Sequence, residues 1–247
     1  MTGAQGPAVT VFPDEEALGR AAADLFPALS REAIASRGRF SAALSGGSTP
    51  RRLYELLGEK PYRDAIDWRR VHVFWVDERC VPRDHRESNF RLAFDAFLSI
   101  VPLPAENIHR IKGEEEPDRA AREYEDDIRT LFGKSGMPTF DLVILGVGED
   151  GHTASLFPDS PLLNERLRIA VPVYLEKPKL NRITLTLPVL NNAARVLVLA
   201  TGEKKAEAVR EILEGPGSAR RPAGLVRPVH GVLQWLIDKK AGQKLTK

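Results

Sequence analysis

Residues Phe140–Leu145 have the sequence FDLVIL, and Gly146–His152, which follow, have the sequence GVGEDGH. An apolar run with so little polar alternation predicts a strand that is buried on both faces. Three other runs share this character: Phe40–Leu44, Val71–Val76 and Arg195–Ala200. Because strands covered on both sides are typical of parallel sheets between helix layers, the four runs favour an α/β fold.

Helical patterns alternate with these runs along the chain. The spacing of apolar residues predicts helices at Asp14–Ser36 (interrupted at Pro27), Pro50–Leu57, Asn89–Leu98, Asp118–Phe132 and Glu203–Leu213. Further strands are predicted at Ala8–Phe12 and Ile183–Leu187, and an exposed loop at Glu214–Arg221, and Val232–Ile237 is a last apolar run. This alternation predicts a doubly wound, mostly parallel sheet flanked by helices, with residues 1–247 forming a single domain.

The composition excludes several functional classes. The chain has 247 residues, of which 43% are hydrophobic and 28% charged, and its net charge is +2. The charges are interspersed, whereas nucleic-acid binders usually carry a basic stripe, so no nucleic-acid partner is predicted. There is no signal-peptide pattern and no apolar run of about 18 residues, and the lone Cys80 excludes an intramolecular disulfide. We therefore expect a cytoplasmic protein with no membrane partner and no obligate protein partner.

The first candidate site follows the strand Phe40–Leu44, because ligands of open parallel sheets bind beyond the carboxyl ends of the strands. The residues there are Gly46, Gly47, Ser48 and Thr49. A hydroxyl residue before a proline predicts a capped helix start, where free N–H groups favour an anion. The segment is neither a Walker A loop nor a G-x-G-x-x-G turn, so phosphate binding and an ordinary capped turn both stay open.

Charged residues follow the next strand, Val71–Val76. Asp77 and Arg79 are placed so that the guanidinium could bind an oxyanion and the carboxylate could orient a neighbour. An ion pair between the two at a solvated strand end is the alternative. His85 has the surroundings of a surface histidine, and Cys80 those of a packing residue.

The segment after FDLVIL carries the strongest chemical signal. Asp150 and His152 stand two residues apart beyond a Gly-x-Gly turn. Imidazole titrates near neutrality and suits general-base catalysis, and a neighbouring carboxylate can fix its tautomer. A polar cap of the loop is the structural alternative.

Two further cations precede predicted elements. Arg182 stands before ITLTL, and Lys205 lies in the first turn of a predicted helix. A lysine there opposes the helix dipole, so either a bound anion or a surface pair with Glu203 would explain it. The chain has no Cys/His cluster, H-E-x-x-H motif or acidic ladder, so no metal is predicted. It also lacks a G-x-S-x-G elbow, which disfavours a serine acyl-enzyme.

Taken in order, LSGGSTP, VDER with DHRESNF, FDLVILGVGEDGHTASLFP, RITLTLPVLNNA and GEKKA resemble the 6-phosphogluconolactonase family. The resemblance extends from about Val9 to Asp238, and GVGEDGHTASLFP is its most specific motif. LSGGSTP is shared with the related glucosamine-6-phosphate deaminases. The resemblance implies a Rossmann-like sheet without a nucleotide. It also implies hydrolysis of 6-phospho-D-glucono-1,5-lactone to 6-phosphogluconate in the pentose phosphate pathway, with no metal or organic cofactor.

The same resemblance implies roles for single residues. His152 matches the family's general base, Asp150 the acidic residue beside it, and Arg79 an arginine that contacts the substrate. The implied substrate- and phosphate-binding positions are Gly46, Gly47, Ser48, Thr49, Asp77, Arg182 and Lys205.

Two other functions are alternatives to this one. A glucosamine-6-phosphate deaminase-like isomerase is expected to carry D-E-Y and N-G-H-I motifs, where this chain has Asp77–Arg79 and Asp150–Thr153. A non-catalytic sugar-phosphate-sensing domain of a regulator predicts an attached helix-turn-helix, for which the residues before Ala8 are too few. An NAD site lacks its glycine fingerprint. We therefore predict a lactonase in which His152 activates water.

Overall fold

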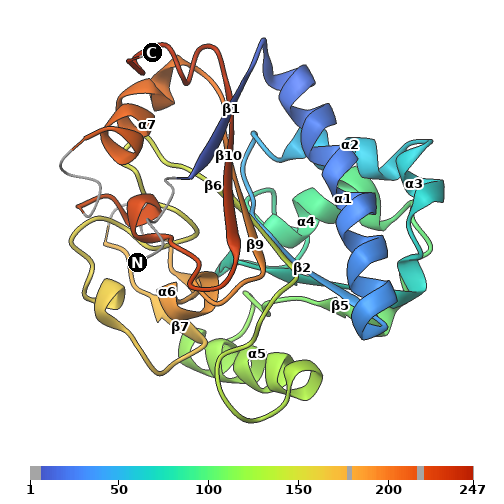
Figure 1. Ribbon diagram of the computed structural model, residues 1–247. Helices are drawn as coiled ribbons and strands as arrows, with labels where there is room; N and C mark the ends of the chain where they lie inside the picture. Colours follow the sequence, from blue (N-terminus) through green and yellow to red (C-terminus); the bar gives the residue numbers. More distant parts are fainter. Residues whose placement is uncertain (1–6, 177–179, 216–219, 247) are drawn as a thin grey trace.

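The computed structural model describes residues 7–176, 180–215 and 220–246. A seven-stranded sheet lies at its centre, and all of its neighbouring strands pair in parallel (Figure 1). In spatial order the strands are β1 (Ala8–Phe12), β10 (Val232–Asp238), β9 (Arg195–Ala200), β6 (Leu142–Gly146), β2 (Phe40–Leu44), β3 (Val71–Trp75) and β5 (Ile108–His109). The predicted α/β class with a parallel sheet is confirmed.

Helices cover both faces of this sheet. They are α1 (Glu15–Arg37), α2 (Arg51–Gly58), α3 (Tyr62–Ala65), α4 (Asn89–Ala93), α5 (Pro117–Phe132), α6 (Leu187–Leu190) and α7 (Ala206–Leu213). In Figure 1, α1 and α2 lie on one side of the sheet, and α6 and α7 lie on the other. The central strands are enclosed between these layers, and every residue of β2 is buried.

The order of the strands creates one switch point. From β2 the chain continues outward through β3 to β5, whereas from β6 it continues the other way through β9 to β10. The loops that leave the neighbouring strands β2 and β6 therefore diverge. In open α/β sheets such a point leaves a crevice beyond the strand ends, which is where ligands bind.

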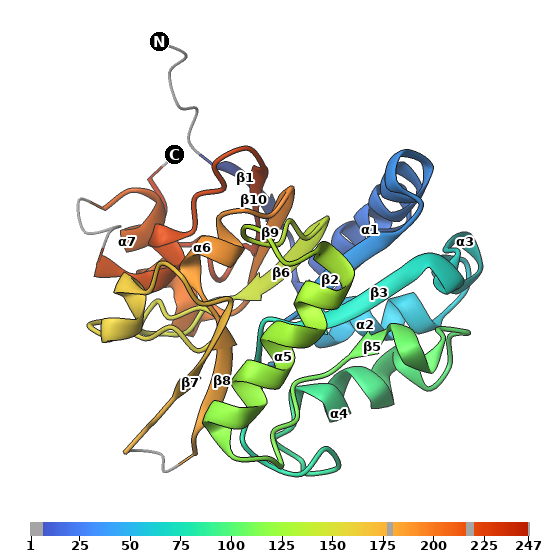
Figure 2. The same ribbon diagram turned by 90° about the horizontal axis from the view of Figure 1, so that it is seen from below.

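A small antiparallel sheet, which the sequence did not predict, lies beside the main one. It consists of β4 (Asp77–Arg79), β8 (Arg182–Leu185) and β7 (Ala170–Val173), in the order β4-β8-β7. Figure 2 shows β7 and β8 reaching away from the main sheet beside α5. Because β4 begins two residues after β3 ends, the small sheet directly extends the carboxyl end of that strand.

The predicted interruption at Pro27 is wrong, since α1 runs unbroken from Glu15 to Arg37. Proline removes one backbone hydrogen bond from a helix and crowds the preceding turn. Here Pro27 and Phe26 are both buried within a long face that packs against the core. The burial of this face offsets the local cost and keeps the helix continuous.

The predicted hydroxyl cap before Pro50 is also wrong. Helix α2 begins at Arg51, and no side chain caps it. Instead, the Thr49 hydroxyl lies 3.0 Å from the Thr201 hydroxyl, at the end of β9. The glycine loop is therefore tied to a neighbouring strand, and its hydroxyl is not used inside its own helix.

Both ends of the described chain enter the same sheet, because β1 pairs with β10. This pairing supports the proposal that residues 1–247 form one domain. Of the predicted loop Glu214–Arg221, residues 216–219 lie outside the described residues, and Arg221 is half-buried rather than exposed. Within the described part of the chain, no helix combines the length and apolar character that crossing a membrane requires.

Candidate active site

A cavity of about 190 Å³ opens where the loops after β2 and β6 diverge. The first loop supplies one wall, the second loop supplies the opposite wall, and β4 and β8 close the side. The lining residues are Ser45, Gly46, Gly47, Ser48, Thr49, Pro50, Asp77, Arg79, Asn89, Gly146, Val147, Gly148, His152, Ala154, Arg182 and Lys205. Every site residue predicted from the sequence is in this set except Asp150, which is hydrogen-bonded to His152.

His152 and Asp150 form a hydrogen-bonded pair at one wall. The imidazole Nδ1 lies 2.6 Å from Asp150 Oδ1, which also accepts the His152 backbone N–H at 3.0 Å. A carboxylate only accepts hydrogen bonds, so Nδ1 carries the proton and Nε2 of the neutral ring keeps a free lone pair. Burial raises the pKa of the Asp150 carboxyl, but the hydrogen bonds and charge of His152 outweigh it and lower this pKa overall.

Gly148 makes this pair sterically possible. A Cβ at position 148 would lie 2.0 Å from His152 Nδ1 and 2.5 Å from Asp150 Oδ1. The loop backbone therefore passes directly under the hydrogen bond, and only glycine leaves room for it. Arg221 holds the loop from outside, because its Nη1 donates to the Asp150 carbonyl at 2.7 Å while its Nε donates to Glu211 on α7 at 2.7 Å.

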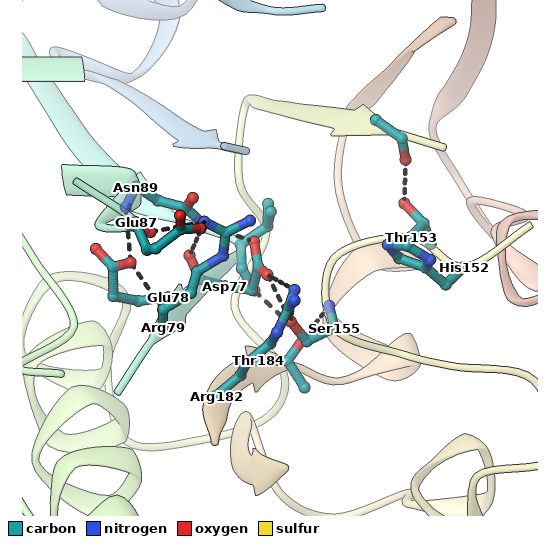
Figure 3. A network of polar contacts seen from close by, with 12 residues as sticks. Asp77, Glu78, Arg79, Glu87, Asn89, His152, Thr153, Ser155, Arg182 and Thr184 are labelled. Carbon is teal, nitrogen blue, oxygen red and sulfur yellow. Dashed lines mark hydrogen bonds and ion pairs between the residues drawn. The ribbon is translucent and has the colours of Figure 1, made fainter. Parts of the chain in front are cut away.

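Asp77, the first residue of β4, lines the cavity and is buried, and its contacts are drawn in Figure 3. The Ser155 hydroxyl donates to its Oδ2 at 2.6 Å, and the Asn89 amide donates to its Oδ1 at 3.1 Å. Arg182 Nη1 lies 4.0 Å from Oδ2. Asp77 thus pairs with Arg182, and the alternative of an Asp77–Arg79 ion pair is wrong. These contacts fix the position of the Asp77 carboxylate, and its role in orienting a neighbour stays a prediction.

Arg79 and Arg182 face each other across the small sheet, where they are directly paired in register. Like charges placed opposite one another on antiparallel strands destabilise the pairing. Burial lowers the pKa of Arg182, Asp77 opposes that shift, and Arg79 adds to it. Both Nε atoms are buried and have no hydrogen-bond partner among the described residues. Two guanidiniums with unused donors beside a cavity are suited to binding an anion.

Lys205 also lines the cavity and ends a 3₁₀ turn (Glu203–Lys205) that leads into α7. The predicted continuous helix from Glu203 is therefore divided into this turn and the α-helix. In the described part of the chain, no carboxylate pairs with Lys205, so the alternative of a surface pair with Glu203 finds no support. Lys205 and the loop Gly46–Thr49 line the same cavity.

Sequence reasoning missed several residues that shape the site. Asn89 and Ser45 line the cavity, and Ser155 orients Asp77. Asn89 stands in the quoted motif DHRESNF, but no chemistry was assigned to it. Glu78, also unassigned, is buried and accepts the backbone N–H groups of Asn89 and Phe90. Burial raises the Glu78 pKa to about 6 despite these hydrogen bonds.

The described residues offer neither a reactive cysteine in the cavity nor a metal-binding cluster. Cys80 packs against the core outside the cavity lining, and burial raises the pKa of its thiol to about 11. At that pKa the group is a thiol near neutrality, which fits a packing role. Across residues 7–176, 180–215 and 220–246, no cluster of three or more His, Cys, Asp or Glu side chains could hold a metal ion.

Comparisons with known proteins agree with this geometry. The model of the glucosamine-6-phosphate isomerases/6-phosphogluconolactonase family matches residues 13–235. The chain belongs to this family. It is 41% identical, over 96% of its length and 75% of the relative's, to the probable 6-phosphogluconolactonase 3, chloroplastic, of Oryza sativa subsp. indica. It is 42% identical, over 96% and 93% of the two lengths, to the 6-phosphogluconolactonase of Homo sapiens.

A solved structure extends the agreement to the fold. The 6-phosphogluconolactonase from Trypanosoma cruzi superposes with a TM-score of 0.87 at 29% identity, over 98% of this chain and 97% of that one. All the predicted site residues fall inside the span that the family model matches. In this member of the family, the glycine loop, the two arginines and the Asp150–His152 pair lie around one cavity.

Proposed function

We propose that the chain hydrolyses 6-phospho-D-glucono-1,5-lactone to 6-phospho-D-gluconate, the lactonase step of the pentose phosphate pathway. The observation that carries this proposal is the Asp150–His152 pair, which faces a cavity whose other walls bear Arg79, Arg182 and Lys205. A general base on one wall and cations on the others match a substrate with an ester at one end and a phosphate at the other. The names of the relatives support the same activity.

In the proposed mechanism, His152 acts as the general base. A δ-lactone is an activated ester, so water suffices as nucleophile once a base removes its proton. Nε2 takes that proton while the water oxygen bonds to C1, and the carbonyl oxygen becomes an oxyanion. The C1–ring oxygen bond then breaks, and the imidazolium can return its proton to the leaving oxygen. Asp150 holds the ring orientation and stabilises the imidazolium charge. No metal or organic cofactor is needed.

The cations bind the other end of the substrate. Because Arg79 and Arg182 lie opposite one another, a phosphate, which has several charged oxygens, can bind both guanidiniums better than a single oxyanion can. This register favours the phosphate as the ligand of Arg79, together with Lys205 and the loop Gly46–Thr49. Binding of the remote phosphate positions C1 at His152. Backbone N–H groups then stabilise the oxyanion, a contribution of about 3 kcal/mol per donor.

A direct assay tests the activity. Freshly generated 6-phosphogluconolactone is added to the purified protein, and acid release is measured above the spontaneous hydrolysis. We expect rapid hydrolysis, together with no ammonia release from glucosamine 6-phosphate. Ammonia release without lactone hydrolysis would favour the deaminase-like alternative, and binding of sugar phosphates without either reaction would favour a sensing domain.

We also propose a cytoplasmic location. The single Cys80 suits a reducing compartment, although the rice relative is named chloroplastic. Cell fractionation with a specific antibody tests this proposal.

A further inference from the structure

Asn89 lines the cavity, but the mechanism above does not use it. It is the first residue of α4 and is only 2% exposed. Its Nδ2 donates to the Asp77 carbonyl at 2.9 Å and to the Asp77 carboxylate at 3.1 Å. Both hydrogens of the amide nitrogen are therefore used, which fixes the orientation of the amide and directs its Oδ1 away from these acceptors.

The Oδ1 atom lies against the glycine loop. A Cβ at position 46 would come within 1.7 Å of Asn89 Oδ1 and 2.3 Å of its Cγ. Gly46 is thus required for the amide to lie beside the loop at the cavity wall. In the part of the chain that the structure describes, no N–H or O–H group donates to this oxygen. The cavity wall here presents an acceptor oxygen that has no donor among the described residues.

Ser45 provides a second, independent observation in the lining of the same cavity. It precedes Gly46, lines the cavity and is 5% exposed. Its carbonyl accepts the Tyr54 hydroxyl at 2.8 Å, but its own Oγ has no hydrogen-bond partner among the described residues. An unpaired buried polar group costs about 1–3 kcal/mol. A ligand group that pairs with this hydroxyl removes that cost.

We propose that Asn89 and Ser45 form a subsite that binds a ring hydroxyl of the substrate and makes the enzyme selective for the hydroxyl pattern of the sugar. Asn89 Oδ1 accepts the hydroxyl hydrogen, and Ser45 Oγ donates to the hydroxyl oxygen. A neutral acceptor disfavours an anion, so the phosphate binds at the cations and the hydroxyl binds here. The inference rests on the proposed function for the identity of the sugar.

Deoxy substrates test this subsite. We would measure kcat/KM for 6-phosphogluconolactone and for its 2-deoxy, 3-deoxy and 4-deoxy analogues. For the wild-type enzyme, kcat/KM should be at least about tenfold lower for one analogue than for the parent lactone, because the polar groups of the site are then left unpaired. Asn89→Ala should lose activity on the parent lactone and should no longer distinguish it from that analogue. Ser45→Ala, which removes a single hydroxyl, should lose part of the same discrimination.

Ser155→Ala is the matched control, because Ser155 also donates to Asp77 but does not line the cavity. It should lower kcat/KM by the same factor on every substrate and keep the wild-type discrimination. Unchanged discrimination in both Asn89→Ala and Ser45→Ala would overturn the inference. Should Asn89→Ala not fold, Ser45→Ala alone decides. If the wild-type enzyme hydrolyses all four lactones equally well, the subsite is refuted but the proposed function is not. If it hydrolyses none of them, the proposed function itself is refuted.

Discussion

Nδ1 of His152 and Oδ1 of Asp150 lie 2.6 Å apart, and the same oxygen accepts the His152 backbone N–H. Two hydrogen bonds to one carboxylate oxygen hold the imidazole in one orientation and one tautomer. The ring therefore presents Nε2, with its lone pair, as the atom that can receive a proton. This relationship sets different expectations for the two residues.

Replacing His152 removes the proposed base. His152→Ala should lower kcat on the lactone by about 100-fold or more, since general-base catalysis contributes 10²–10⁴-fold. The melting temperature should change little, because the side chain is 30% exposed. The control is His85→Ala, which removes an exposed histidine outside the cavity lining. A His152→Ala variant with the wild-type rate, after subtraction of spontaneous hydrolysis, would refute the mechanism.

Replacing Asp150 leaves the base but frees the ring. Asp150→Asn should lower kcat with a smaller change in KM, because the amide can also stabilise the wrong tautomer. The lowered pKa of Asp150 keeps its carboxylate ionised near neutrality, so its protonation should not limit the wild-type rate there. Steady-state kinetics on Asp150→Asn and on Glu149→Gln, its exposed neighbour, test this. Equal kcat in the two variants would contradict an orienting role.

Gly148 offers a steric test that removes no functional group. In Gly148→Ala the new Cβ would overlap the space of His152 Nδ1, 2.0 Å away, and must displace the imidazole or the loop. We expect a fall in kcat that approaches that of His152→Ala. Gly146→Ala, at the end of β6, is the matched control, because its Cβ would meet nothing within 4 Å and we expect a far smaller fall in kcat. Similar kinetics for the two variants would mean that the position of the imidazole does not limit the rate.

Replacing Lys205 tests where the phosphate group of the substrate binds. Lys205→Ala should raise KM about tenfold or more and leave kcat within a few-fold, if its contact is equally strong in the ground and transition states. Its neighbour Lys204 is exposed and outside the cavity lining, so Lys204→Ala should keep the wild-type KM. Initial rates over a range of lactone concentrations separate the two constants. A normal KM in Lys205→Ala would place the phosphate elsewhere.

The sequence predicted the parts of this site that depend on local pattern. Apolar runs such as Phe40–Leu44 specify buried strands, and the polar residues at their carboxyl ends must then meet at one edge of a parallel sheet. That rule alone brings the glycine loop and the segment of Asp150 and His152 together. The assignment of chemistry to them depended on the family motif as well.

Contacts set by strand register could not be predicted in this way. The three residues of β4, Asp77–Arg79, are all charged and show no strand pattern, so their pairing with β8 was invisible. Only that pairing places Arg79 opposite Arg182. Likewise, Ser155 donates to Asp77 across 78 positions of sequence, a relationship that no local spacing encodes. Pro27 shows the reverse case, in which packing overrides a correct local preference.

The last prediction concerns stability in acid and a histidine pair that lies outside the cavity lining. His72 Nδ1 lies 3.0 Å from His109 Nε2, and His109 Nδ1 lies 3.0 Å from Asp127. Burial, followed by the charges of His109 and Arg39, lowers the pKa of His72 to about 4. The unfolded chain, with an ordinary pKa of about 6.5, therefore binds a proton that the native state excludes, and native stability falls as the pH drops from about 6.5 towards 4. Because His72 is partly exposed, we expect the free energy of unfolding to fall by about 1–2 kcal/mol after solvent screening.

Urea unfolding at pH 7.5 and pH 5 measures this fall. The free energy of unfolding should decrease less on acidification in His72→Gln than in wild type, whereas His85→Gln should show the wild-type decrease. The same loss in His72→Gln and wild type would place the acid-sensitive group elsewhere.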